Sequence, residues 1–424
     1  MNRLYTKVFI PAVLFIAAFT VNINSQDTIK IVTYNLLNYP GSDTTVRNPY
    51  FRKTMKALNA DIICVQEVGL TSGVPGFLNN VLNAAEGSGY SSGTFINGYD
   101  SDNAVFYKTS KFTFLSNTPI NAGSNSRDLN EFKLIHNATG DTIRLISLHL
   151  KAGNTSSDAL RRSSEVDSLR NFTNRYPEGT DFLVMGDFNI YGSSEAAYQK
   201  MLQITPGVEG ELYDIISMTG TWNTPGYAPY HTQSPRTRQF GGGSTGGMDD
   251  RFDMILMSKA VKAVGGMEYI ASTMKAYGND GNHYNDSINK PSNTAVGQEL
   301  ADALHYASDH LPVVAMFRMN PPVGVDNEAG PVTSFALNQN YPNPFNPGTT
   351  ISYSVPAEGW LNFRIFNISG EQVASAFEGE VNQGSYSYYF DASGLSSGVY
   401  FAVAEFKSAA GVQVREVLKM TLLK

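Results

Sequence analysis

The stretch FLVMGDFNI, residues 182–190, ends an apolar run with a carboxylate and an amide two positions apart. Because side chains at alternate positions of an extended segment share a face, Asp187 and Asn189 can project together from the end of one strand. Their oxygens are of the kind that binds a hard divalent cation. Alone the pattern is weak, since Asp and Asn at the end of a strand are most often turn or cap residues.

Polar side chains stand beside several other apolar runs in the same manner. Each run has the pattern of a buried strand, and the polar residue ends it, interrupts it or directly precedes it. The residues concerned are Asn35 (VTYN), Gln66 and Glu67 (CVQE), His149 (LISLHL), Asp253 (RFDMIL), and Asp309 with His310 (ASDHLPVV).

Each position alone also has an ordinary structural explanation. His149 fits a satisfied core histidine, and Asp253 fits a salt-bridge partner of Arg251. A set of such positions beside separate apolar runs is better explained by one site. Because the set contains carboxylates, amides and imidazoles and no thiolate, it predicts a site for Mg²⁺ or Mn²⁺, with Ca²⁺ as a further alternative.

The elements that must position these residues alternate between strands and helices along residues 28–317. Phe51, Met55 and Leu58 have the spacing of one helix face. Residues 132–150 have the pattern of a β-hairpin around the polar turn NATGD. Residues 156–172 have the pattern of an N-capped amphipathic helix. This alternation predicts an α/β fold.

A Pro- and Gly-rich stretch, residues 319–334, predicts a linker between residues 27–318 and a second domain at residues 335–424. The second domain has short alternating strands, which predict a small all-β sandwich. At the N-terminus, Arg3 and Lys7 precede an apolar run that is shorter than the ~20 residues of a membrane span. Residues 1–25 therefore have the pattern of a cleaved signal peptide, and no stable membrane span is expected.

Composition excludes some classes of site. The single cysteine, Cys64, rules out an intramolecular disulfide and a cysteine zinc site. A net charge of −7 provides no basic surface for non-specific binding of nucleic acid. It does not exclude a phosphate substrate, because bound cations can invert the charge of an acidic site.

Taken in chain order, these motifs resemble those of the endonuclease/exonuclease/phosphatase superfamily, whose DNase I-like fold is a four-layer α/β sandwich. The motifs are Asn35, Gln66-Glu67, His149, the Gly186–Asn189 run, Asp253 in RFDMIL, and Ser308-Asp309-His310. The resemblance covers roughly residues 28–317. It is specific because six separated motifs recur in the right order, whereas GDFN alone is common.

The resemblance implies a metal site in which Glu67 ligates the ion with support from Asn35 and Asp309. His149 matches a position that is His in the DNase I-like and sphingomyelinase-like branches and Tyr in the abasic-endonuclease branch. This residue favours an extracellular phosphodiesterase over a DNA-repair enzyme.

The resemblance also implies catalytic roles. Asp187 and Asn189 would orient or deprotonate the attacking water and contact the phosphate. His310, held by Asp253, would donate to or polarise the phosphoryl group. The chemistry is coherent without the family, since phosphodiester hydrolysis needs Lewis-acid stabilisation of charge and groups that carry protons.

The second domain resembles a type A sorting domain of type IX secretion, built as an immunoglobulin-like sandwich. The likeness rests on residues 337–356, 363–373, 396–406 and 419–424. It implies the type IX machinery as a partner, passage across the outer membrane, and a secreted or cell-surface location. A carbohydrate-binding or adhesive sandwich is the alternative.

Together these features predict a monomeric, secreted, divalent-metal-dependent phosphodiesterase. A nuclease that hydrolyses extracellular DNA or RNA with a metal-activated water is the leading hypothesis. A sphingomyelinase-like lipid phosphodiesterase is one alternative, and a catalytically inactive surface binding module is another. Within this hypothesis, the loop at residues 241–250 is expected on the substrate side, and Arg236 and Arg238 are expected in a solvated loop.

Overall fold

The computed structural model describes residues 27–84, 89–262, 266–319, 334–340, 343–381, 383–392 and 394–424. The predicted signal peptide lies outside the described residues, as does all of the predicted linker except Met319 and Ser334. Within the described ranges, no helix is long and apolar enough to cross a membrane.

The first sheet of the N-terminal domain is seven-stranded, with the order β10-β12-β1-β2-β4-β3 and with β11 also paired to β12. Its two central strands, β1 and β2, run parallel, and the other pairs are antiparallel. The strands are β1 (Asp27–Tyr39), β2 (Ile62–Val68), β3 (Tyr90–Ser92), β4 (Asp102–Lys108), β10 (Met267–Tyr269), β11 (Lys275–Ala276) and β12 (Val313–Met319).

The second sheet is five-stranded, with the order β5-β6-β7-β8-β9. Strands β7 and β8 are parallel, and β6 with β7 forms the predicted hairpin. The strands are β5 (Phe112–Ile120), β6 (Leu129–His136), β7 (Thr142–His149), β8 (Phe182–Asp187) and β9 (Asp253–Met257).

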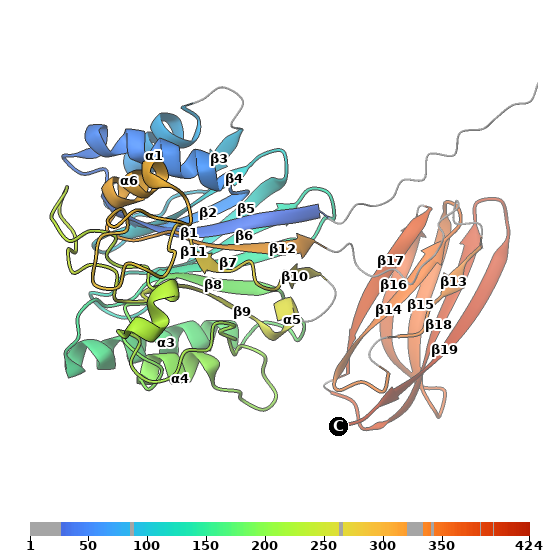
Figure 1. Cartoon of the computed structure of the whole chain (residues 1–424). Coiled ribbons are helices and arrows are strands. Elements are labelled where there is room, and N and C mark those ends of the chain that lie inside the picture. The colour runs from blue at the N-terminus through green and yellow to red at the C-terminus, as the bar shows by residue number, and fades with distance from the viewer. Residues whose placement is uncertain are drawn as a thin grey trace, which may run out of the picture.

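The two sheets pack face to face, and helices cover their outer faces, which gives four layers (Figure 1). Alternation along the strands produces this packing: Ile29 and Ile31 face the core between the sheets, whereas Val32 and Tyr34 face the helical layer. The predicted four-layer α/β sandwich is therefore confirmed. The helical elements are α1 (Thr44–Leu58), α2 (Gly73–Phe77), η1 (Leu78–Leu82), α3 (Ser156–Thr173), α4 (Ala196–Leu202), η2 (Pro225–Tyr230), α5 (Lys259–Lys262) and α6 (Gln298–Ala307).

The structure has helices, α1 and α3, at both segments where the sequence predicts them. In α1, Phe51, Met55 and Leu58 are buried. Helix α3 begins with a capping box in which Thr155 and Asp158 satisfy each other's backbone N–H groups. Each helix thus buries the face that its apolar spacing defines.

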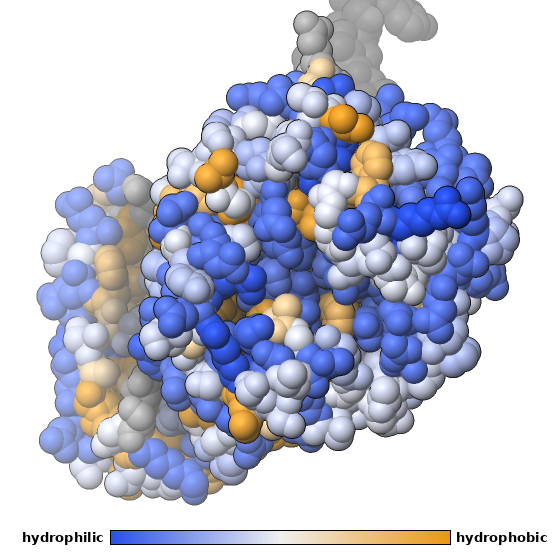
Figure 2. Space-filling view, turned by 90° about the vertical axis from the view of Figure 1, so that its left-hand side faces the viewer, coloured by the Kyte–Doolittle hydropathy of each residue, from blue (hydrophilic) through white to orange (hydrophobic). Residues whose placement is uncertain are grey.

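The parallel pairs β1–β2 and β7–β8 bring the carboxyl ends of four strands to one edge of the sandwich. The register places Asn35 opposite Gln66, and it places His149 and Asp253 on either side of Asp187. Figure 2 looks onto this side of the molecule, where hydrophilic residues surround a hollow. The polar residues of separate chain segments therefore converge on one face.

The C-terminal domain is a sandwich of two antiparallel sheets with its own apolar core. Alternating residues such as Ile351, Tyr353 and Val355 fill this core, as the sequence pattern predicts. One sheet contains β13 (Ala336–Leu337), β14 (Gly348–Val355) and β17 (Gly384–Asp391), and the other contains β15 (Gly359–Asn367), β16 (Gln372–Val381), β18 (Gly398–Ser408) and β19 (Gln413–Leu422).

Candidate active site and metal centre

Asn35 connects the two sheets at the centre of the site. It is fully buried in β1, and its Nδ2 donates to Glu67 Oε1 at 3.0 Å and to Asp187 Oδ2 at 3.1 Å. One amide thus holds a carboxylate from each sheet. This contact explains why an Asn stands among the apolar residues of β1.

Glu67 stands on β2 with an unusual backbone conformation. Its φ is +59°, a region that non-glycine residues rarely adopt and that costs about 1–3 kcal/mol. The register between β1 and β2 shifts after Asn35, and the Glu67 carboxylate accepts a hydrogen bond from Asn38 N–H at 2.9 Å. Burial and the neighbouring Asp309 raise the pKa of Glu67, while Asn35 and His310 oppose that rise.

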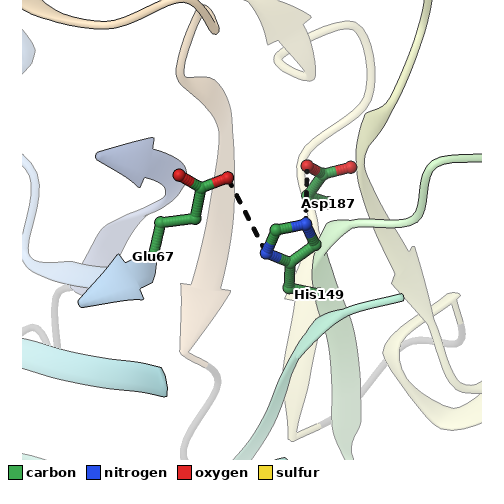
Figure 3. Close-up of side chains that lie close together, drawn as sticks. All are labelled: Glu67, His149 and Asp187. Atoms are coloured by element: carbon green, nitrogen blue, oxygen red, sulfur yellow. Dashed lines mark ion pairs between the residues drawn. The ribbon is translucent and has the colours of Figure 1, made fainter. Parts of the chain in front are cut away.

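His149 lies between the carboxylates of the two sheets (Figure 3). Its Nε2 is 3.5 Å from Asp187 Oδ2, and its Nδ1 is 3.9 Å from Glu67 Oε1. Burial lowers the pKa of His149 well below the ordinary value, and the positive charges of Arg127 and His310 add to this effect. The ring is therefore neutral at neutral pH.

Asp187 ends β8 with its carboxylate buried. Its Oδ1 accepts from the backbone N–H of Asn189 at 3.1 Å, and Asn189 Nδ2 donates to the carbonyl of Leu150. Burial raises the pKa of Asp187 to about 7; His310 opposes the rise, whereas Asp253 and Glu67 reinforce it. A carboxyl group of this pKa can exchange a proton near neutral pH.

His310 forms a buried pair with Asp253. Its Nδ1 donates to Asp253 Oδ2 at 2.7 Å, and its Nε2 is 3.7 Å from Asp187 Oδ2. Burial acts to lower the pKa of His310, but the carboxylates of Asp253, Asp187 and Asp309 outweigh it and hold this pKa well above its ordinary value. His310 is therefore a cation at neutral pH.

Asp309 faces the site from the segment before β12. Its Oδ2 accepts from Ser244 N–H at 2.6 Å, while its Oδ1 is buried without a hydrogen-bond partner. At Gly243, where φ is +77°, a Cβ would come within 2.5 Å of Asp309 Oδ2. Only a glycine at position 243 therefore lets the loop of residues 241–250 approach Asp309 this closely.

The structure therefore brings together Asn35, Glu67, His149, Asp187, Asn189, Asp253, Asp309 and His310, the whole set selected from the sequence. The alternative that Asp253 is a salt-bridge partner of Arg251 is wrong. Arg251 pairs with Asp214 at 2.7 and 2.9 Å, and Asp253 accepts a hydrogen bond from His310 instead. The expectation that Arg236 lies in a solvated loop is also wrong. Arg236 is fully buried, and its Nη1 donates to the carbonyl of Phe240.

Two polar residues near the site, Gln233 and Asn103, were not selected from the sequence. The carboxamide group of Gln233 contacts His310 Nε2, where its oxygen is the atom that can accept from the protonated ring, although Gln233 stands in an irregular loop. Asn103 Oδ1 accepts from Ser147, whose hydroxyl in turn accepts from Gln66 at 2.9 Å. Asn103 stands at the start of the apolar strand β4, a signal that could have identified it.

The residues present fit a hard divalent cation. Glu67, His149 and Asp187 each offer one ligand atom, and these atoms lie within 4.8 Å of one another. The buried Nδ1 of His149 and the buried Oδ1 of Asp309 have no hydrogen-bond partner, and both are lone-pair donors. Oxygen donors without thiolates suit Mg²⁺ or Mn²⁺, so the carboxylates of Glu67 and Asp187 are the donors that fit a hard ion best.

Comparison with known proteins identifies both domains. The sequence model of the endonuclease/exonuclease/phosphatase family matches residues 19–310. The sequence model of a secretion system C-terminal sorting domain matches residues 339–418, which confirms the type IX resemblance. No curated protein matches the chain.

Several solved structures are similar at low identity. D. rerio TDP2 in complex with single strand DNA product is 16% identical with a TM-score of 0.46, and the match covers 69% of this chain and 99% of that one. The catalytic domain of human Nocturnin is 18% identical with a TM-score of 0.43, covering 70% and 98%. A protein from Enterococcus faecalis V583 described as functionally unknown is 14% identical with a TM-score of 0.45, covering 69% and 100%.

The family match spans more than half of the chain, and the matched range includes the residues assembled at the strand ends. The C-terminal sorting domain indicates export by type IX secretion to the cell surface or beyond. The protein therefore belongs to the endonuclease/exonuclease/phosphatase family and is a hydrolase of that family that carries a type IX sorting domain.

Proposed function

We propose that the protein is a divalent-metal-dependent nuclease that hydrolyses phosphodiester bonds of extracellular DNA or RNA. The observation that carries the proposal is the pair of imidazoles beside Asp187. His149 lies 3.5 Å and His310 lies 3.7 Å from its Oδ2, one ring neutral and the other cationic. A proton acceptor beside a fixed positive charge is what attack of water on a phosphodiester requires.

In this proposal Asp187 accepts the proton of the attacking water. Its raised pKa makes it a stronger base than an ordinary carboxylate, and Asn189 N–H fixes its orientation. His310 supplies positive charge to the phosphoryl oxygens through Nε2, while Asp253 keeps its Nδ1 protonated. His149, being neutral, offers a lone pair or one N–H without adding charge.

Glu67 would ligate the cation, with Asn35 orienting its carboxylate through Nδ2 and with Asp309 in support. When bound, a Mg²⁺-type ion supplies Lewis-acid stabilisation of charge on the phosphoryl oxygens. Asp309 has one buried carboxylate oxygen without a hydrogen-bond partner, and its charge helps to raise the pKa of Glu67, which supports a role for both carboxylates at the cation.

A substrate panel tests the polymer assignment. The purified full chain is incubated with plasmid DNA, RNA, sphingomyelin vesicles and bis-p-nitrophenyl phosphate, each with Mg²⁺ or Mn²⁺. Cleavage of DNA or RNA is expected. Turnover of sphingomyelin alone would replace the nuclease proposal with the lipid phosphodiesterase, and turnover of no substrate by a folded, metal-binding chain would favour a binding module.

The proposal includes a cleaved signal peptide at residues 1–25. It would carry the chain across the inner membrane, and the sorting domain would then direct passage across the outer membrane. N-terminal sequencing of the mature protein tests this, and a mature N-terminus close to Gln26 is expected.

A further inference from the structure

A row of buried polar residues lies between the two sheets of the catalytic domain, beside the reaction centre. This polar network consists of Thr33 (β1), Gln66 (β2), Asn103 (β4), Asn130 (β6) and Ser147 (β7), each at most 3% exposed. On every one of these strands, the residue two positions further from the site belongs to the apolar core between the sheets: Ile31, Cys64, Val105, Phe132 and Leu145. The polar network therefore separates that core from the catalytic residues.

Hydrogen bonds join the polar network into one chain that passes back and forth between the sheets. Gln66 Nε2, on the first sheet, donates to Ser147 Oγ on the second sheet at 2.9 Å and to Thr33 Oγ1 at 3.1 Å. Ser147 Oγ donates to Asn103 Oδ1 on the first sheet at 3.1 Å, and Asn103 Nδ2 donates to Asn130 Oδ1 on the second at 3.0 Å. In the part of the chain that the structure describes, none of these side chains has a buried polar atom without a partner.

The polar network contacts the reaction centre from both sheets. Gln66 directly precedes Glu67, and Ser147 stands two positions before His149, on the same face of β7. Glu67 belongs to the first sheet, whereas His149 and Asp187 belong to the second. Because the candidate ligand atoms of these three residues lie within 4.8 Å of one another, their geometry depends on the spacing of the two sheets. The Gln66–Ser147 hydrogen bond spans that spacing.

Apolar side chains at the same positions would define this spacing less sharply. The hydrophobic effect has no direction, whereas a hydrogen bond restricts both the distance and the angle between its partners. Replacing both partners of a hydrogen bond by apolar groups of the same shape can leave stability nearly unchanged. A fully satisfied buried network, in contrast, rigidifies the elements that it joins. Placement of the sheets is therefore the property for which these polar residues are needed.

We propose that Ser147 and Asn103 are positioning residues, which hold Glu67 of the first sheet at the distance from His149 and Asp187 that one divalent cation requires. Neither residue touches the cation or the substrate. Ser147 acts on Glu67 through Gln66, and Asn103 acts through Ser147. The inference rests on the proposed metal-dependent reaction and adds to it the residues that set the width of its metal site.

The test compares the full-length wild type with Ser147→Ala and Asn103→Ala. Isothermal titration calorimetry measures the affinity for Mn²⁺, and hydrolysis of bis-p-nitrophenyl phosphate at saturating Mn²⁺ gives kcat and KM. Residues that support metal ligands typically affect metal affinity or activity by about 10–100-fold. In both variants the affinity for Mn²⁺ and kcat should therefore fall by about tenfold or more, with KM within about twofold of the wild-type value.

A matched control separates this role from a merely structural one. Thr173→Val also removes a fully buried hydroxyl, which donates to the Gly210 carbonyl at 2.9 Å outside the polar network. It should keep the affinity for Mn²⁺ and kcat within about twofold of the wild type, even where urea unfolding shows a similar loss of stability. The double variant Ser147→Ala/Asn103→Ala should bind Mn²⁺ about as well as either single variant, because both changes break the same chain.

Two outcomes would overturn the inference and leave the proposed function intact. One is an affinity for Mn²⁺ and a kcat within about twofold of the wild type in Ser147→Ala, an exchange that removes a single oxygen and is decisive even if Asn103→Ala does not fold. The other is an equal loss in Thr173→Val. A wild type that neither binds Mn²⁺ nor hydrolyses the diester would instead overturn the proposed function.

Discussion

At the scale of single residues, the site contains two imidazoles that share a neighbour but differ in charge. Both lie within 3.7 Å of Asp187 Oδ2. His149 has a buried Nδ1 without a hydrogen-bond partner, whereas His310 donates its Nδ1 proton to Asp253 at 2.7 Å. Asp253 is therefore the residue that makes one imidazole a cation and gives the two rings different roles.

Replacing Asp253 with Asn should remove the charge that keeps His310 protonated. Asn preserves the size of the side chain but cannot stabilise an imidazolium, so kcat/KM for bis-p-nitrophenyl phosphate should fall by about 100-fold or more. Asp27→Asn is the matched control, because Asp27 pairs with His136 at 3.0 Å outside the site. A decrease of the same size in both variants would contradict the role of Asp253.

Replacing Glu67 with Gln should weaken binding of the divalent cation. The loss of one carboxylate ligand is expected to lower the affinity for Mn²⁺ by about tenfold or more, as measured by isothermal titration calorimetry. Glu299→Gln, at an exposed carboxylate that pairs with Lys53, should leave the affinity unchanged. An unaltered affinity in Glu67→Gln would place the cation elsewhere.

At the scale of elements, the site depends on the exact placement of strand ends, and a buried ion pair fixes one of them. Arg251 stands two residues before the start of β9 and donates to both carboxylate oxygens of Asp214, with each side chain only 1% exposed. Asp253 follows two residues later. The pair therefore anchors the strand that carries the partner of His310.

Asp214→Ala should destabilise the fold by about 3–5 kcal/mol at pH 7, because it leaves a buried guanidinium unpaired. Burial acts to raise the pKa of Asp214, but Arg251, Tyr198 and the N–H of Ile216 lower it overall. A carboxyl group whose pKa is lower in the folded than in the unfolded protein stabilises the fold at pH values above its unfolded pKa of about 3.9. This stabilisation is lost as the pH falls through the pKa of the folded state. Urea unfolding at pH 7 and pH 3 measures the free energy of unfolding of the wild type and the variant. The difference between these two free energies should therefore be smaller at pH 3 than at pH 7.

The strands and the main site residues were predictable from sequence because both follow local rules. Apolar runs identified β1, β7 and β8, and polar residues at the ends of such runs identified Asp187 and His310. Gln233 and Arg236 were not predictable, since both stand in an irregular loop whose path is set by tertiary contacts. The left-handed backbone of Glu67 likewise depends on a register shift between two strands.

At the scale of the whole molecule, catalysis and export belong to parts with separate cores. Among the described residues, the core of the C-terminal sandwich contains only residues 335–422, and the cores of the catalytic domain contain none of these. The sandwich is therefore expected to direct transport without contributing to the reaction.

Deletion of residues 335–424 should abolish export and leave the chemistry intact. The shortened chain is expected to accumulate in the periplasm, with kcat/KM for bis-p-nitrophenyl phosphate within about twofold of that of the full chain. Cell fractionation and an assay of the purified proteins measure both quantities. Appearance of the shortened chain outside the cell would show that the sandwich does not direct export.

The most direct test of the account is hydrolysis of bis-p-nitrophenyl phosphate by the full chain, with Mg²⁺ and then with EDTA. The wild type should turn over only with the metal, and His310→Ala should lose at least about 100-fold in kcat/KM. His136→Ala, which removes an imidazole paired to a carboxylate elsewhere in the domain, should retain activity. Turnover that persists in EDTA or in His310→Ala would contradict a metal-dependent reaction centre at these strand ends.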